Sequence, residues 1–115
     1  MISVRRVLTA VLLGLPLLAA MPAIGAPAEP EFPIVIRNHR FEPAEVRVPA
    51  NTKVRLVISN EDASAEEFES KELKREKVIP GKGKAVVLVG PLKAGRYPFF
   101  GEFNEATAKG VLIAE

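Results

Sequence analysis

The sequence has no cysteine or tryptophan, and it has one histidine and one tyrosine among its 115 residues. Without cysteine, no disulfide can cross-link the chain and no thiolate can bind a metal, which excludes a copper–thiolate centre. A single histidine gives no support to hydrolytic catalysis, because no serine or cysteine nucleophile with a placed histidine base can be named. Any metal must therefore be bound by oxygen ligands and at most one imidazole.

The first 28 residues have the features of an export leader. Arg5 and Arg6 form a positively charged start, residues 7–20 are almost wholly apolar, and small residues follow. The apolar run of about 14 residues is shorter than the roughly 20 that span a bilayer, so a cleaved signal peptide is favoured over a retained anchor. Cleavage after Ala28 fits best and cleavage after Ala26 is the alternative. We expect a periplasmic protein with no membrane span after cleavage.

Residues 29–115 are expected to form one small domain, since this length just suffices to assemble a core without cross-links. The formal charge of +2 comes from Arg5 and Arg6, so 14 basic and 14 acidic residues balance in the rest of the chain. There is no basic surplus to attract nucleic acid and no interleaving of aromatic and basic residues to stack bases. Stability must come from packing, because disulfides are absent.

The periodicity of residues 29–115 is that of an all-β domain. Short apolar or alternating runs rich in valine, isoleucine and phenylalanine are separated by turns containing proline, glycine or asparagine. The predicted strands are residues 32–37, 45–48, 53–59, 76–79, 84–89, 95–100 and 110–114. Seven strands at regular spacing predict a Greek-key β-sandwich. The charged segment 64–75 is predicted as the longest loop, with a short helical turn around residues 70–74.

Phe41-Glu42-Pro43 precedes a strand and a tight turn, and Asn60 ends the next long strand. Glu66-Glu67-Phe68 follows, and the last motif is residues 95–113. The order and spacing of these motifs, over nearly the whole of residues 32–114, resemble the cupredoxin family. The resemblance places Glu66 where the family has its first copper-ligating histidine, and residues 95–113 at the copper-binding end.

The resemblance implies that the usual copper ligands have been replaced. A blue-copper member of the family would carry cysteine near Gly101, histidine near Asn104 and methionine near Ala108, and this sequence has none of them. Type 1 copper is therefore not expected. Asn104 is a poor metal ligand, so an intact copper site is not implied.

Four segments are more narrowly similar to the periplasmic cupredoxin-like proteins associated with bacterial iron uptake. They are residues 38–43, 66–70, 73–76 and 97–103. The resemblance implies an iron or copper ion as the bound metal. It also implies a second periplasmic iron-binding protein and an inner-membrane iron permease as partners. Some of these proteins assist the oxidation of ferrous iron, and this is the activity that the resemblance implies.

The candidate ligands are carboxylates and the single histidine. Glu66, Glu67 and Glu69 lie within four positions, but side chains of an extended segment alternate, which places Glu67 and Glu69 on the face opposite Glu66. In a cupredoxin-like sandwich, His39 and Glu102 would approach the same end. Carboxylates and imidazole suit iron, manganese, zinc or Cu(II), and ferrous iron fits best. The predicted ligands are His39, Glu66, Glu67 and Glu102, with Glu69 and Glu105 in reserve.

A second interpretation stays open for the same charged segment. Its acids are faced by Lys71, Lys74, Arg75 and Lys77, a pattern that is typical of a solvated, ion-paired loop. In that case the domain binds no metal and is a protein-interaction module that docks on another periplasmic protein through complementary charge.

Overall fold

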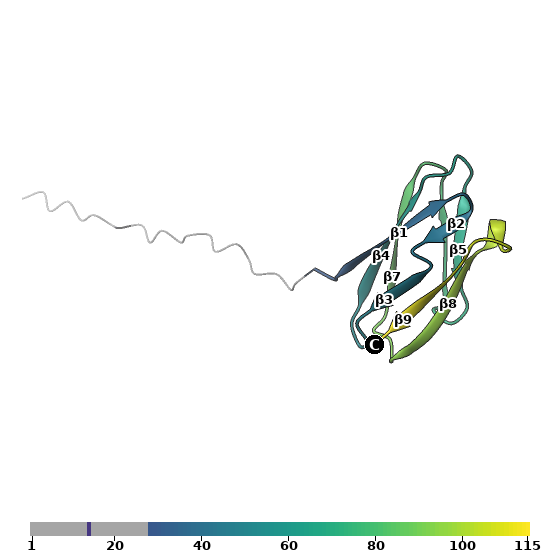
Figure 1. Cartoon of the computed structure of the whole chain (residues 1–115). Coiled ribbons are helices and arrows are strands. Elements are labelled where there is room, and N and C mark those ends of the chain that lie inside the picture. The colour runs from purple at the N-terminus through teal and green to yellow at the C-terminus, as the bar shows by residue number, and fades with distance from the viewer. Residues whose placement is uncertain (1–13, 15–27) are drawn as a thin grey trace, which may run out of the picture.

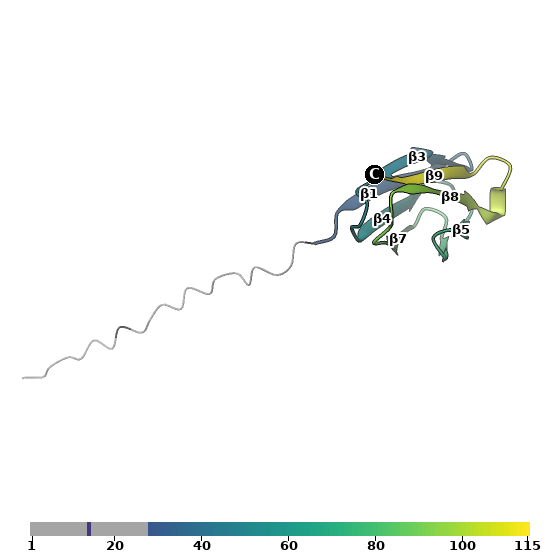
Figure 2. The same cartoon turned by 90° about the horizontal axis from the view of Figure 1, so that it is seen from below.

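The computed structural model describes Gly14 and residues 28–115, and these residues form a sandwich of two β-sheets (Figures 1 and 2). The expected signal peptide lies almost wholly outside the described residues. The strands are β1 (Glu31–Arg37), β2 (Arg40–Glu42), β3 (Glu45–Val48), β4 (Val54–Asn60), β5 (Glu66–Ser70), β6 (Arg75–Ile79), β7 (Lys84–Val89), β8 (Gly95–Gly101) and β9 (Lys109–Ala114). A short 3₁₀ turn, η1 (Glu102–Asn104), follows β8.

The two sheets have four and five strands. The first has the order β2-β1-β4-β7 and the second the order β3-β9-β8-β5-β6. The pairs β1–β4 and β3–β9 are parallel, and the other neighbouring strands are antiparallel. The predicted all-β sandwich is thus confirmed.

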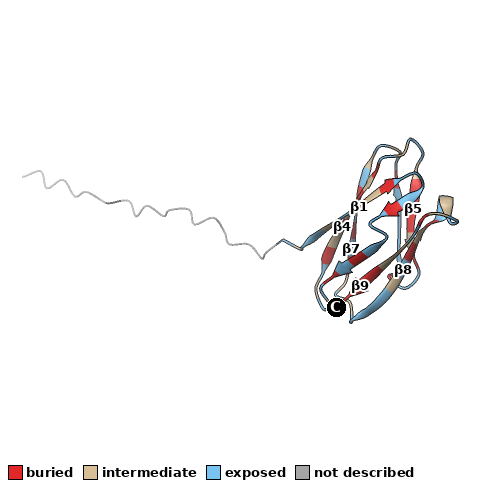
Figure 3. Cartoon of the chain, viewed as in Figure 1, coloured by how far each residue is buried: buried red, intermediate tan, exposed pale blue. Residues whose placement is uncertain are grey.

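Alternating burial explains how the strands build the core between the sheets (Figure 3). In β4 and β7 every second residue is buried, so one face of each strand is apolar and packed while the other meets solvent. Three phenylalanines from both sheets form the aromatic centre. The ring centroids of Phe68 and Phe99 lie 4.9 Å apart, and Phe41 stands edge-on to both, at 6.1 Å from Phe68 and 5.0 Å from Phe99.

All seven predicted strands are present, but the interpretation of residues 64–75 as a long loop is wrong. Its centre is β5, an inner strand between β8 and β6. Strand β2 was also missed, because it is only three residues long. In β5 the inward-facing residues are Glu66, Phe68 and Ser70. Two of these three are polar, which hides the alternation that identifies a strand. Only residues 71–74 form a turn.

The aromatic centre gives the first prediction. Phe68→Ala should lower the free energy of unfolding by about 3–5 kcal/mol, because the Phe68 side chain is wholly buried and the surrounding sheets cannot close the cavity. Phe103→Ala is the matched control and should change stability by no more than about 0.5 kcal/mol, since Phe103 is 53% exposed. Urea unfolding followed by circular dichroism measures both. Equal losses would contradict the assignment of Phe68 to the core.

Candidate metal centre

Strand β5 sends consecutive glutamates to opposite faces of its sheet. Glu66 points into the sandwich and is 1% exposed, whereas Glu67 and Glu69 lie on the outer face. Glu67 is nevertheless only 7% exposed, because neighbouring elements cover it. Strand β6 pairs with β5 so that Glu76 stands directly opposite Glu69, on the same outer face.

Three of these outer carboxylates meet. One carboxylate oxygen from each of Glu67, Glu76 and Glu102 lies within 4.8 Å of the other two. Glu67 comes from β5, Glu76 from the edge strand β6, and Glu102 from η1, which directly follows β8. We refer to Glu67, Glu76 and Glu102 as the acidic cluster. Glu67 is its buried member, and the other two are exposed.

The acidic cluster is electrostatically strained. Hydrogen bonding with Glu76, followed by burial and by the neighbouring Glu102, raises the pKa of Glu67 to about 8. The pKa of Glu69 is also raised, chiefly through a hydrogen bond with Glu102. Among the described residues, no hydrogen-bond partner reaches the buried Oε1 atom of Glu67. A buried oxygen without a donor is costly, so the geometry favours a proton or a cation at this point.

Within residues 28–115, no salt bridge joins a lysine or arginine to the acidic cluster. The ion pairs within the described part of the chain instead involve Glu29, Glu31, Glu42, Glu45, Glu61 and Glu115. The lysines and arginines of residues 71–77 therefore do not form the ion-paired network expected of a solvated loop. Three unpaired carboxylates that can each give an oxygen at close range are suited to a hard cation.

Glu66 is held differently from its neighbour. Its Oε1 accepts hydrogen bonds from the backbone N–H of Phe103 at 2.9 Å and of Glu67 at 3.0 Å. Its Oε2 accepts a hydrogen bond from Nδ2 of Asn104 at 2.6 Å. A Cβ atom on Gly101 would lie 2.6 Å from Cδ of Glu66, so the carboxylate occupies space that only glycine leaves free.

His39 lies in a turn that the side-chain carboxylate of Asp62 holds in place. Asp62 accepts hydrogen bonds from the backbone N–H of His39 and of Asn38, both at 2.9 Å. The bond from His39 is the largest cause of the lowered pKa of Asp62. The exposed imidazole is 3.5 Å from Oγ of Ser64. It is not among the groups that converge on the acidic cluster.

The structure therefore brings together two of the four predicted ligands, Glu67 and Glu102. Glu66 and His39 do not join them, and Glu76, which is not among the predicted ligands, takes part. Recognising β5 as a strand would have found Glu76, since a hairpin of residues 66–70 and 75–79 places positions 69 and 76 opposite each other. Of the reserves, Glu69 borders the acidic cluster, and Glu105 lies elsewhere.

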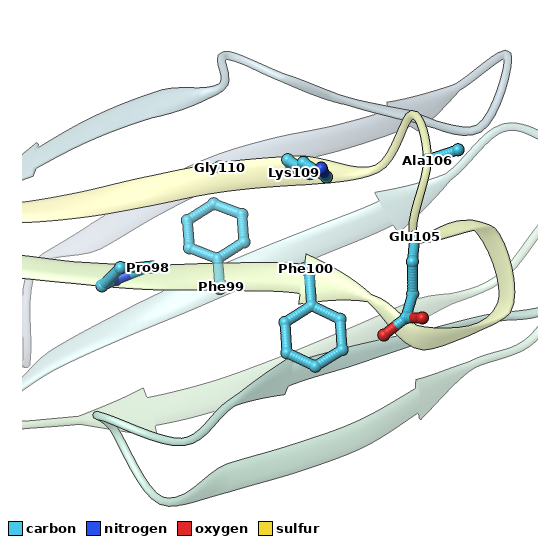
Figure 4. A pocket seen from close by; sticks show the side chains of 7 residues that line it. All are labelled: Pro98, Phe99, Phe100, Glu105, Ala106, Lys109 and Gly110. Carbon is cyan, nitrogen blue, oxygen red and sulfur yellow. The ribbon is translucent and has the colours of Figure 1, made fainter.

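Glu105 lines an open groove over β8 and β9 (Figure 4). The rings of Phe99 and Phe100 point to opposite sides of β8, and the Glu105 carboxylate lies beside Phe100. Phe100 is the register partner of Glu69, but none of the residues that line the groove belongs to the acidic cluster.

Among the described residues, no helix is long and apolar enough to cross a membrane.

Comparison with known proteins identifies the family. The sequence-family model described as "Cupredoxin-like domain" matches residues 7–114 of this chain. The chain belongs to this family. An uncharacterised protein of Rickettsia prowazekii (strain Madrid E) is 45% identical over 83 residues, which cover 72% of this chain and 66% of that protein, just under two thirds of its length.

Two solved structures show the same fold at low sequence identity. The cupredoxin-like chain superposes on auracyanin A, a "blue" copper protein from Chloroflexus aurantiacus, with a TM-score of 0.64, 13% identity and coverage of 74% of this chain and 98% of that one. It superposes on the metal-binding domain of the Cu(I)-exporting P-type ATPase of Streptococcus pneumoniae D39 with a TM-score of 0.63, 15% identity and coverage of 74% and 84%.

The residues of this cupredoxin-like protein do not fit a type 1 copper centre. Such a centre needs a cysteine thiolate, and the chain has no cysteine. The buried Glu66 carboxylate, already bonded by three N–H groups, lies against Gly101 instead. The acidic cluster on the outer face is better suited to a metal than this position.

The raised pKa of Glu67 gives the second prediction. In the unfolded chain this carboxyl loses its proton near its ordinary pKa of 4.5, while the folded protein keeps the proton until about pH 8. Because the folded state binds more protons over this window, the free energy of unfolding of the metal-free protein should fall as pH rises through it. Glu67→Gln should reduce the fall, and Glu69 should account for part of what remains.

Urea unfolding at several pH values between about 5 and 8, in the presence of a chelator, measures this dependence. Glu72→Gln is the control, because Glu72 is exposed in the turn after β5 and should leave the dependence unchanged. If the free energy of unfolding of the unmodified protein rises with pH over this window, the claim that Glu67 keeps its proton in the folded state is wrong.

Proposed function

We propose that this cupredoxin-like protein is a periplasmic metal-binding accessory that takes up iron at the acidic cluster. The observation that carries the proposal is the convergence of the carboxylates of Glu67, Glu76 and Glu102 within 4.8 Å, without a neutralising basic side chain among the described residues. The copper proteins that share the fold support a metal-handling role in general.

The ligand chemistry favours iron over Cu(I). Carboxylate oxygens are hard anionic ligands, whereas Cu(I) prefers thiolate and thioether sulfur. Hard oxygen ligands stabilise Fe(III) relative to Fe(II), so ferrous iron bound by the acidic cluster would lose an electron more easily. Cu(II) is both an alternative cation for these ligands and a candidate acceptor of that electron.

The cellular role that we propose rests on the resemblance to the iron-uptake proteins and on the expected export leader. In this role the protein passes iron to an inner-membrane permease and acts together with a second periplasmic iron-binding protein. The metal content of the protein purified from the periplasm of its own cells would test the native cation directly.

The third prediction concerns metal binding in vitro. The purified, chelator-treated protein should bind Fe(II) under anaerobic conditions with a Kd well below about 1 mM, as measured by isothermal titration calorimetry. Glu67→Gln combined with Glu76→Gln should abolish binding, because the change keeps the side-chain shape but removes two charges. Affinity should also fall on acidification, since the ligands must be ionised to bind.

Two control variants sharpen this experiment. His39→Ala and Glu72→Gln should leave the affinity unchanged, because neither side chain belongs to the acidic cluster. A loss of binding in His39→Ala would show that His39 is a metal ligand, as the sequence predicts. If the unmodified protein binds none of Fe(II), Cu(II) and Mn(II) more tightly than about 1 mM, the proposal fails and the metal-free interaction module remains.

A further inference from the structure

We infer that Glu66 is a positioning residue: its buried carboxylate anchors η1 to β5 and thereby sets the place of Glu102 in the acidic cluster. This inference rests on the proposed function, because it assigns a role within the same metal site. It differs from the sequence-based prediction, in which Glu66 is itself a ligand.

The hydrogen bonds of Glu66 connect the two elements that carry Glu67 and Glu102. The Oε1 atom accepts a hydrogen bond from the backbone N–H of Glu67 at 3.0 Å. It accepts a second one, at 2.9 Å, from the backbone N–H of Phe103, the residue after Glu102. The Oε2 atom accepts Nδ2 of Asn104 at 2.6 Å. One carboxylate therefore joins β5 to both residues that follow Glu102.

Burial of its own side chains does not hold η1 in place. The turn has no buried residue and no side-chain cap at its first residue, so hydrophobic packing does not fix its position. A single 3₁₀ turn of three residues has little stability of its own. At its other end, the backbone carbonyl of Asn104 accepts the N–H of Ala108 at 2.8 Å, which closes the loop back toward β9.

Close packing keeps the Glu66 carboxylate in one position. A Cβ atom on Gly101 would lie 2.8 Å from Oε1 of Glu66 and 2.7 Å from Cβ of Ala108, so the carboxylate fills the space between small residues. The side chain is 1% exposed. Three N–H donors bind this carboxylate and solvent hardly reaches it, so Glu66 is placed to anchor the backbone, and each such bond to a charged group is comparatively strong.

Some residues do not touch a metal but orient the side chains that bind it. Mutation of such a residue commonly lowers the metal affinity by ten- to a hundredfold. Asn104→Ala removes the donor to Oε2, and Glu66→Gln places an amide group where three donors converge. Both variants should weaken Fe(II) binding by about tenfold or more while the protein stays folded. Asn104→Gln keeps an amide N–H that can donate to Glu66 without adding a metal-ligating group, and it should restore part of the affinity.

The control separates positioning from a general loss of stability. Val46→Ala removes buried volume from β3, which is separated from β5 by β9 and β8, so it should lower stability and leave metal affinity unchanged. Isothermal titration with Fe(II) and urea unfolding are applied to all four variants. Affinities of Glu66→Gln and Asn104→Ala equal to that of the unmodified protein would overturn the inference.

A second measurement does not depend on metal. Amide hydrogen exchange should show the Phe103 N–H protected in the unmodified protein and at least about tenfold faster in Asn104→Ala, because the anchor has loosened. If the unmodified protein binds no metal, the proposed function fails, and the anchoring role is judged by this exchange alone. Unchanged exchange at Phe103 would overturn it.

Discussion

The alternation of side chains along β5 is the constraint on which the candidate site depends. Successive residues of a strand must face opposite sides of the sheet, so Glu66 enters the sandwich while Glu67 stays on the outer face. Inside, a carboxylate persists only if N–H groups satisfy its oxygens, and Glu66 has three such donors. Outside, Glu67 meets two other acids, and their mutual repulsion is relieved by a proton or a cation.

Much of the fold could be predicted from the sequence, and the exceptions have a physical cause. Seven strands were recognisable because their inward residues are apolar and turns with proline or glycine separate them. Strand β5 was not, because Glu66 and Ser70 face inward and their polar groups are satisfied by residues far along the chain. The membership of the cupredoxin family was visible in the order of the motifs, whereas the iron-uptake role stays a prediction.

The candidate site was only partly predictable. The choice of Glu67 and Glu102 followed from the expected end of the sandwich, and the structure brings these two together. Glu76 could be selected only if β5 was recognised as a strand, because the hairpin with β6 is what places Glu76 opposite Glu69. The pairing of Glu66 with Asn104 was equally hidden, because it depends on the space left by Gly101.

The position of β6 has a consequence for the behaviour of the protein in concentrated solution. This strand is the edge of its sheet, and its residues Arg75, Glu76 and Lys77 are exposed. Charged side chains on an edge discourage the addition of a strand from another molecule. Because Glu76 belongs to the acidic cluster, a cation or proton that neutralises it would also remove one of these charges. The tendency of the chains to self-associate is thereby coupled to the ionic state of the cluster.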